Sequence, residues 1–239
     1  MCSNYRAVTR ADWLLNFFGV GPAETGAESI ETWPTGQAPY IRLNEAGKRI
    51  AATGHFGLLP HFAKDIAYGR KTYNARSETV AKLPSFSTSW QRGQRCIIPA
   101  ECIYEPFYAT ATSKPVRWAI RIGHNIPMGI AGVYNTWRDP EGREHGSFAM
   151  LTVNADDHPV MSRFHAWGEE KRMVVILDSA EKYDEWLTCS VDEAPSFFQQ
   201  YRGTLETEAA PLPPRAAKPK APPKPPADEP PAPATGDLF

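Results

Sequence analysis

Residues 95–105 read Arg-Cys-Ile-Ile-Pro-Ala-Glu-Cys-Ile-Tyr-Glu, a run in which apolar side chains dominate. Short apolar runs with β-branched and aromatic residues are typical of buried strands, so we predict strands over Arg95–Pro99 and Glu101–Tyr108. The next patterned segment, Val116–Ile122, alternates between apolar and polar residues, as a strand with one buried face does. The predicted inward side chains are Val116, Trp118, Ile120 and Ile122, and the outward ones are Arg117 and Arg121.

Further strands and short helices flank this stretch on both sides. Two hairpins are predicted around turns that contain glycine, Pro39–Leu43 with Arg49–Leu59 and Met128–Trp137 with Ser147–Asn154. The remaining elements are a strand over Arg172–Leu177 and short helices over Arg10–Phe18, Pro84–Gln91 and Ala180–Leu187. Because strands do not alternate regularly with helices, the sequence predicts an α+β fold. We expect a mixed or antiparallel sheet, curled toward a barrel, with short peripheral helices.

The composition divides the chain into a folded part and a tail. The 239 residues are 42% hydrophobic, enough for a domain of about 200 residues to bury a core. After about Leu205 the composition changes, and Pro211 to Pro233 consist mainly of Pro and Ala with scattered Lys. Such a segment buries too little surface to offset its ordering entropy. We therefore predict a folded domain over residues 1–205 and a disordered, polyproline-leaning tail over residues 206–239.

Charge and cysteine content narrow the function classes. The formal net charge is −1, so binding to nucleic acid requires a local basic patch rather than a global field. The four cysteines form no CxxC pair, which argues against a zinc ribbon or a disulfide framework. Cys96, Cys102 and Cys189 are expected to be small buried hydrophobes. No apolar run is long enough to span a membrane and no signal segment is visible, so we predict a cytoplasmic protein without membrane contact. We also predict that it uses no metal and no cofactor.

Cys2 directly follows the initiator Met1. Methionine is normally trimmed before a small side chain, so we expect the mature chain to begin at Cys2, with a free α-amine and a thiol on one residue. Such a 1,2-aminothiol condenses with an aldehyde through the amine and then closes a five-membered thiazolidine ring through the sulfur. Both groups titrate near neutrality, the amine at roughly pH 7.7–8.0 and the thiol at about 8.5. The alternative is that a cysteine at this position is an accident of a frayed terminus.

Asn74 and Arg76 lie in a polar segment between well-patterned ones, Tyr73-Asn-Ala-Arg-Ser-Glu-Thr79. Residues two apart on an extended segment project from the same face. Asn74 is thus placed to hydrogen-bond a polar substrate while Arg76 meets a phosphate. The alternative is a solvated loop with an Arg–Glu pair.

Two titratable side chains stand out further along the chain. Glu105 lies within an otherwise apolar strand, where a carboxylate that lines a cavity would suit acid–base chemistry. The alternative is an outward-facing residue with a Lys or Arg partner. His165 is well matched to proton transfer at neutral pH, although a lone histidine is more often structural. His158 has no carboxylate at metal-ligand spacing, so no metal site is predicted. The segments around Pro34 and Phe56 supply rigid and aromatic surfaces, which plain packing would also explain.

Several separated motifs occur in the order and spacing of one known family. They are Met1-Cys2, Trp33-Pro-Thr35, Phe56-Gly-Leu-Leu-Pro60, Asn74-Ala-Arg-Ser-Glu-Thr79, Arg95 through Glu105, and Met161-Ser-Arg-Phe-His165 through Leu177. With them the chain, from Met1 to about Leu187, resembles the SOS-response-associated peptidase family. Members of that family recognise abasic sites in single-stranded DNA and couple to them covalently. The resemblance implies a family-type fold and a role in DNA damage repair.

The resemblance also implies a role for each candidate residue. Cys2 would be the nucleophile that captures the abasic site as a thiazolidine, with Asn74 holding the ring-opened sugar. Glu105 would move protons during Schiff-base formation and ring closure. His165 would assist sugar-ring opening and later release, so crosslink reversal and strand-cleaving lyase activity are implied too. Arg76 would contact the backbone phosphate.

Contacts to bases and to a second phosphate match the family less closely. The Pro34 and Phe56 region would wedge against neighbouring bases. Relatives often continue Met-Cys with Gly-Arg, whose Arg contacts phosphate, whereas this chain has Ser3-Asn4 and Arg6 is the nearest substitute. Many relatives also have Trp after the catalytic Glu and in the Gly-Leu-Pro motif, where this chain has Pro106 and Phe56. Weaker base stacking is therefore expected.

Alternatives stay open for both activity and partners. An N-terminal Cys with a nearby Asn and His also suits an N-terminal-nucleophile cysteine peptidase or amidohydrolase, as the family name suggests. A non-covalent DNA-binding module would give Cys2 no role. The terminal residues Asp237, Leu238 and Phe239 resemble a sliding-clamp peptide on a proline-rich tether, although the usual leading Gln is missing and a chance apolar terminus would look the same. We expect a nucleoid-associated monomer that binds single-stranded DNA.

Overall fold

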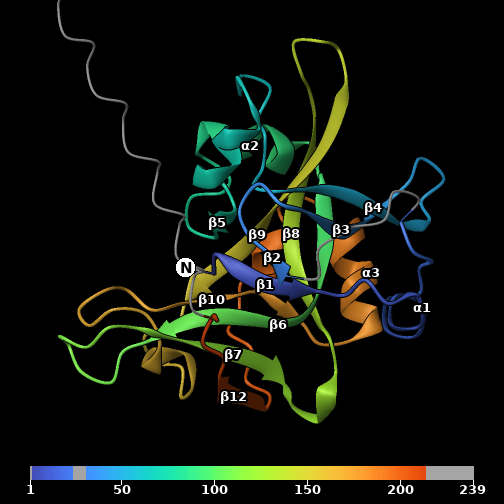
Figure 1. Cartoon of the computed structure of the whole chain (residues 1–239). Coiled ribbons are helices and arrows are strands. Elements are labelled where there is room, and N and C mark those ends of the chain that lie inside the picture. Colours follow the sequence, from blue (N-terminus) through green and yellow to red (C-terminus); the bar gives the residue numbers. More distant parts are fainter. Residues whose placement is uncertain (1, 24–30, 214–239) are drawn as a thin grey trace, which may run out of the picture.

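A ring of five strands forms the centre of the fold, as the computed structural model shows (Figure 1); residues 2–23 and 31–213 are described. In ring order the strands are β3 (Gln37–Leu43), β4 (Arg49–Phe56), β9 (Glu144–Asn154), β8 (Met128–Arg138) and β6 (Arg95–Phe107). Each strand pairs with the next, and β6 also pairs with β3, which closes the ring. Within the ring β4 and β9 run parallel and the other pairs antiparallel. The predicted mixed, barrel-like sheet is therefore confirmed.

Shorter strands extend the ring into one 12-stranded sheet. They are β1 (Asn4–Ala7), β2 (Glu31–Thr32), β5 (Asn74–Arg76), β7 (Val116–Ile122), β10 (Arg172–Val174), β11 (Ile176–Leu177) and β12 (Leu205–Ala209). β1 lies between β6 and β2, and β7 lies between β6 and β12. β5 and β10 both pair with β9, and β11 pairs with β8. The C-terminal half of β6 thus lies next to the N-terminal strand of the chain.

Short helices lie outside the ring (Figure 1). The α-helices are α1 (Ala11–Phe18), α2 (Pro84–Gln91) and α3 (Ala180–Thr188), and the 3₁₀ turns are η1 (Ile66–Lys71), η2 (Gly123–Asn125), η3 (Met161–Arg163) and η4 (Ala194–Phe197). α1 buries Leu14 and Phe18 and ends at Gly19, whose left-handed φ of 69° suits glycine. The Trp186 indole on α3 donates to the Cys96 carbonyl of β6 at 2.9 Å. All three predicted helices are present.

β6 runs unbroken through both strands that were predicted around Pro99. Proline has no amide to donate, so it is tolerated in a sheet at irregular positions. Here the register between β1 and β6 shifts between Arg6 and Ala7, close to Pro99, and the Pro99 carbonyl still accepts from the Val8 amide at 3.0 Å. A local irregularity therefore takes up the proline, and β6 continues as one strand to Phe107.

Two expectations at the sheet margin need correction. Val116 is exposed rather than inward because it pairs with Phe107 at the far end of β6. The folded part also extends beyond residue 205, because β12 pairs with β7 and carries residues 206–209 into the sheet. The rest of the predicted tail from residue 214, with Asp237, Leu238 and Phe239, lies outside the described residues, as does Met1.

Candidate active site

Cys2 lies just before β1 and is almost fully buried, with 2% of its surface exposed. β1 pairs with β6 so that Asn4 faces Tyr104, which brings Cys2 to the C-terminal part of β6. The side-chain amide of Asn74, on β5, donates to the Cys2 carbonyl at 2.8 Å. The thiol donates to the Asn4 carbonyl at 3.5 Å. Two strands far apart in the sequence, β1 and β5, therefore hold this residue.

Glu105 and His165 form a buried pair at the same end of β6. Glu105 Oε2 and His165 Nε2 are 2.9 Å apart, and both side chains are almost fully buried. The His165 amide donates to the Pro106 carbonyl at 2.9 Å, and its φ of 66° is left-handed, which is uncommon for a residue with a β-carbon. The Arg172 amide approaches His165 Nδ1 at 3.5 Å, which favours the tautomer with the proton on Nε2. In that tautomer His165 donates to Glu105.

The electrostatic environment keeps the Cys2 thiol protonated. Burial raises the pKa of this thiol well above its ordinary value, and the negative charge of Glu105 raises it further. Burial also raises the pKa of Tyr73, and the negative charge of Glu105 adds to that effect. Glu105, Cys2 and the partly buried Tyr73 therefore lie close enough together for the Glu105 charge to influence both of the others.

Asn74 offers an unused hydrogen-bond acceptor beside Cys2. Its Nδ2 is occupied by the Cys2 carbonyl, which fixes the orientation of the amide. Its Oδ1 is buried and has no partner among residues 2–23 and 31–213. Buried polar atoms are rarely left unpaired. The Asn74 Oδ1 atom is thus available to a donor on a ligand.

Both arginines that were predicted to contact phosphate are engaged in surface ion pairs. Arg76 Nη1 lies 2.8 Å from Glu170 Oε2, and Arg6 Nε lies 3.0 Å from Glu101 Oε2. Each arginine side chain is about half exposed. The Arg–Glu pair that was the alternative for the Asn74 segment is therefore present, although its carboxylate comes from a distant loop.

Phe56 does not reach the surface, so the prediction that it contacts bases is wrong. Its ring is fully buried and packs against Tyr5 and Phe148, with ring centroids 5.1 and 5.8 Å away. Gly57 follows with a φ of 129°, and a β-carbon there would lie 2.2 Å from the Gly69 carbonyl oxygen. The motif that begins at Phe56 therefore serves close packing between β4 and η1, as the alternative interpretation had it.

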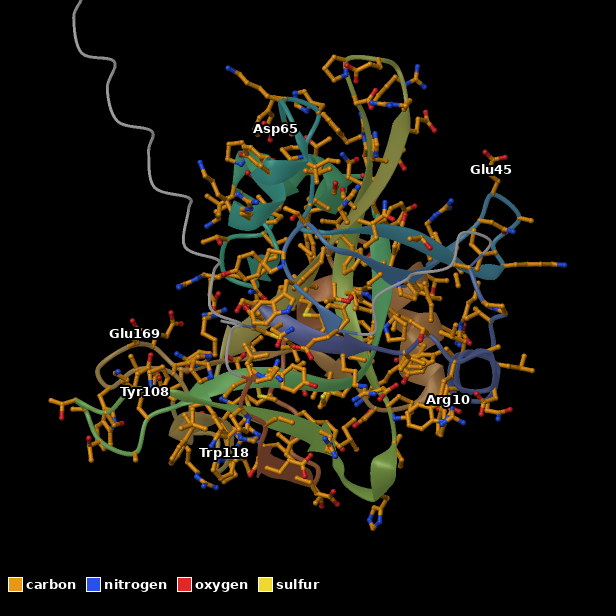
Figure 2. All side chains as sticks on the ribbon, viewed as in Figure 1. Arg10, Glu45, Asp65, Tyr108, Trp118 and Glu169 are labelled. Atoms are coloured by element: carbon orange, nitrogen blue, oxygen red, sulfur yellow. The ribbon has the colours of Figure 1, made fainter. Side chains whose placement is uncertain are left out.

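Two exposed tryptophans lie near the strands that flank β1, one after β2 and the other beside the residue that follows β6. Trp33 follows β2 and is 43% exposed, with Pro34 half-buried beside it. Trp167 comes two residues after His165 and is 64% exposed, and its indole approaches the Tyr108 carbonyl at 3.4 Å. Figure 2 shows Tyr108 and Glu169 at one edge of the molecule, where this loop meets the end of β6. No pattern in the sequence marks Trp167, because it lies in an irregular turn.

Arg117 is another residue that the sequence did not single out for the site. Its guanidinium lies over the Tyr104 ring, 4.0 Å from the centroid. Nη1 donates to Asn4 Oδ1 at 2.7 Å and also contacts Glu31. Nε donates to the Ala210 carbonyl at 2.8 Å. One side chain thus ties β7 to β1, to β2 and to the residue after β12.

The other cysteines and the helices add no further site. Cys96 and Cys102 are buried, as predicted, whereas Cys189 is partly exposed, and all are free thiols. In residues 2–23 and 31–213 no group of three or more His, Cys, Asp or Glu side chains is arranged to hold a metal ion. Over the same residues, every helix is too short or too polar to cross a membrane.

Known proteins resemble this chain in sequence and in fold. The model of the family described as SOS response associated peptidase (SRAP) matches residues 1–214. The abasic site processing protein YoqW of Bacillus subtilis (strain 168) is 27% identical over 190 residues, which cover 78% of this chain and 80% of that protein. The abasic site processing protein HMCES of Pongo abelii is 24% identical over 176 residues, 62% of this chain and 48% of that protein. A crystal structure of a Bordetella bronchiseptica protein has a TM-score of 0.80 and 35% identity, and it covers 88% of this chain and 100% of that chain.

Proposed function

The chain belongs to the SOS response associated peptidase family, and from that membership we propose that it processes abasic sites in single-stranded DNA by linking them covalently to Cys2. The observation that carries the proposal is the meeting of Cys2, Asn74, Glu105 and His165 at one end of β6. A ring-opened abasic site presents an aldehyde, and a terminal Cys2 presents the amine and the thiol that trap an aldehyde in a ring. The names of the related proteins support the same substrate class.

The order of the two covalent steps follows from the state of the thiol. Because the pKa of the buried Cys2 thiol is raised, the sulfur keeps its proton while the amine attacks the aldehyde carbon. The resulting carbinolamine loses water and becomes an imine. The sulfur then adds to the imine carbon, the thiol proton is transferred to the ring nitrogen, and a thiazolidine closes. These steps need neither an oxidant nor a metal-bound group.

The neighbouring side chains fit the proton transfers that these steps need. The Glu105 carboxylate is the base that takes the thiol proton and returns it to nitrogen. His165, which donates to Glu105 through Nε2, orients this carboxylate and supplies a proton when the sugar ring opens. Asn74 holds the Cys2 carbonyl with its amide and accepts a sugar hydroxyl at its unpaired Oδ1.

The imine is a branch point, which supports the proposed lyase and reversal activities. Removal of a proton from the carbon next to the imine expels the 3′ phosphate and cuts the strand. Sulfur addition competes with this elimination because it consumes the imine. Protonation of the ring at Cys2 reverses closure and regenerates the imine. The balance between crosslink and cleavage is thus set by how readily the Cys2 sulfur closes the ring.

The rival peptidase function fits the geometry less well. A cysteine peptidase needs a thiolate with a base hydrogen-bonded to it. Here burial favours the neutral Cys2 thiol, the thiol donates to the Asn4 carbonyl, and His165 is engaged with Glu105. Aldehyde capture begins at the amine and needs the thiol only at ring closure, when Glu105 can take its proton, so it is the function that these contacts favour.

One experiment distinguishes the two functions. The purified full chain is incubated with single-stranded DNA that carries one abasic site, and heat-stable adducts are separated on a denaturing gel. We expect an adduct with the wild type and none with Cys2→Ala; Cys2→Ser should give at most a weaker adduct. Cys96→Ala, which removes a buried thiol away from the site, is the matched control and should crosslink normally. A wild type that forms no adduct but cleaves peptides through Cys2 would overturn the proposal, as would an intact mass that retains Met1.

Docking of the C-terminal residues on a sliding clamp is proposed on the sequence alone. Leu238 and Phe239 are the expected anchors, and the proline-rich segment is the tether. A labelled peptide of the last residues should bind a bacterial clamp, and Leu238→Ala with Phe239→Ala should abolish binding. Equal binding by both peptides would remove the idea. A monomeric state is proposed as well, and light scattering tests it.

A further inference from the structure

Glu170 is held by three donors from three parts of the fold. Its Oε2 accepts from Arg76 Nη1 at 2.8 Å, and its Oε1 accepts from Arg172 Nη1 at 2.5 Å and from Asn154 Nδ2 at 3.3 Å. Arg172 is fully buried, whereas the Glu170 side chain is 36% exposed, so the pair is shielded from water on the arginine side only. Partial burial is the largest single influence and opposes ionisation, but the hydrogen bond and charge of Arg172, the Asn154 hydrogen bond and the charge of Arg76 together outweigh it and lower the pKa of Glu170. The carboxylate that faces Arg76 is therefore charged and fixed.

Arg76 lies where a DNA phosphate next to the captured sugar would reach. It is two residues after Asn74 on β5, so both side chains leave the same face of the strand, about 6–7 Å apart along it. Its guanidinium is about half exposed, whereas Asn74 points into the buried site. This guanidinium has an anionic partner within the protein itself, Glu170.

We propose that Glu170 is a specificity-determining residue that occupies the phosphate position at Arg76 and so weakens non-covalent binding to intact single strands. The inference rests on the proposed function, in which Arg76 meets a backbone phosphate. A phosphate that approaches Arg76 must share the guanidinium with the Glu170 carboxylate or displace it, and the two anions repel each other.

This arrangement separates damaged from undamaged DNA. Binding to an intact single strand relies on charge neutralisation at phosphates, and each lost contact weakens it. An abasic strand is retained by the covalent bond to Cys2, which does not depend on the phosphate contact once it has formed. The Glu170 carboxylate beside Arg76 therefore lowers the fraction of intact DNA that is bound much more than it lowers the final yield of adduct on abasic DNA. A protein with a net charge of −1 would in this way sample DNA briefly until it meets an aldehyde.

The test compares two neighbouring carboxylates in a background that cannot crosslink. The full chain with Cys2→Ala is titrated with a fluorescent, undamaged oligothymidine at several salt concentrations. Glu170→Gln should bind about fivefold more tightly at low salt, since one repulsive charge near the phosphate is removed. The slope of log K against log salt should steepen by about 0.7, as for one additional phosphate contact. Glu169→Gln, an exposed neighbour with the same change in charge and no ion pair described, should change the affinity by less than about twofold.

Arg76 provides the second arm of the test. Glutamine at position 170 keeps an oxygen that can accept from Arg172, and Arg172 also keeps its ion pair with Glu78. The Glu170→Gln chain should therefore fold, and thermal unfolding checks that it does. If it does not fold, Glu170→Ala is used in its place. In an Arg76→Ala background the gain from Glu170→Gln should vanish. Equal affinities for Glu170→Gln and Glu169→Gln, or a gain that persists without Arg76, would overturn the inference. Loss of adduct formation by the Cys2 chain would instead refute the proposed function, and the two readouts are separate.

Discussion

Glu105 is the residue whose chemistry can be isolated most cleanly, because glutamine keeps its shape and its bond to His165 but cannot accept a proton. We expect Glu105→Gln to slow adduct formation by about 100-fold, the lower end of the range for a lost general base. Quenched time courses with abasic single-stranded DNA measure the rate. Non-covalent affinity for undamaged DNA should stay unchanged, since Glu105 is almost fully buried and does not form part of the surface.

Glu101 supplies the matched control for this substitution. It lies on the same strand, β6, but it is partly exposed and pairs with Arg6 at 3.0 Å. Glu101→Gln should leave the rate of adduct formation within about twofold of the wild type, because a surface pair contributes little. If Glu105→Gln reacted as fast as Glu101→Gln, Glu105 would have no part in the proton transfers.

Single residues could be predicted where their type conflicts with their surroundings. A carboxylate in an apolar strand marked Glu105, and a polar segment between patterned ones marked Asn74. Phe56 could not be placed from sequence, because an aromatic residue at a strand end packs inward or outward with the same local pattern. Glu170 could not be paired with Arg76 either, since the partners lie on β5 and in a loop joined only through the folded sheet.

At the scale of elements, the turn between η3 and β10 presents Trp167 in a fixed position. Lys171 Nζ donates to the Ala166 carbonyl at 2.6 Å, and the Glu169 amide donates to the same carbonyl at 3.2 Å. Gly168 takes a left-handed φ of 78°, which closes the turn. An exposed indole on a rigid turn beside the site is suited to stack on a DNA base.

We expect Trp167→Ala to weaken binding of single-stranded DNA by about fivefold to tenfold, near the lower end of the range for loss of one stacked base. Trp167→Phe should retain most of the affinity, because a ring remains. Leu15→Ala, which truncates an exposed apolar side chain on the distant helix α1, is the control and should have no effect. Fluorescence anisotropy with the Cys2→Ala chain measures all three. Equal affinity of Trp167→Ala and Leu15→Ala would rule out a base contact.

Elements formed by local interactions were predictable, and those that depend on distant partners were not. The hairpin of β3 and β4 follows from apolar runs around a glycine turn, and the helices follow from their own spacing and end signals. β6 was predicted as two strands because Pro99 interrupts the pattern, and only the shift in register against β1 shows how the strand continues. β12 was missed because Leu205–Ala209 has little apolar content and is a strand only through its pairing with β7.

For the whole molecule, closure of the ring is what brings the site together. The pairings of β6 with β3 and with β8, and the parallel pairing of β4 with β9, join segments that no local pattern connects. The site then draws on β1, β5, β6 and the segment after η3. From the sequence, a curled mixed sheet could be inferred from the absence of regular alternation between strands and helices. Which strands neighbour each other could not, because that choice depends on non-local packing.

The boundary of the folded part yields a prediction at this scale. A chain that ends at residue 213 keeps β12 and the Ala210 carbonyl that Arg117 contacts. A chain that ends at residue 204 loses both, so β7 becomes an unpaired edge and Arg117 loses one of its anchors while it still holds Asn4. We expect the longer chain to unfold within about 2 °C of the full protein and to form adducts at the same rate, since only the tail is missing.

The shorter chain should be destabilised by about 2–4 kcal/mol, from several lost backbone hydrogen bonds, which lowers its unfolding midpoint by roughly 5–15 °C. Below that midpoint its rate of adduct formation should also fall, because Arg117 links β12 to the strand that carries Cys2. Scanning calorimetry measures the unfolding midpoint of both chains, and the adduct time course is run on both at 25 °C. If the two chains unfolded at the same temperature, β12 would add nothing to the fold; if the longer chain were as unstable as the shorter, residues after 213 would be part of the folded structure.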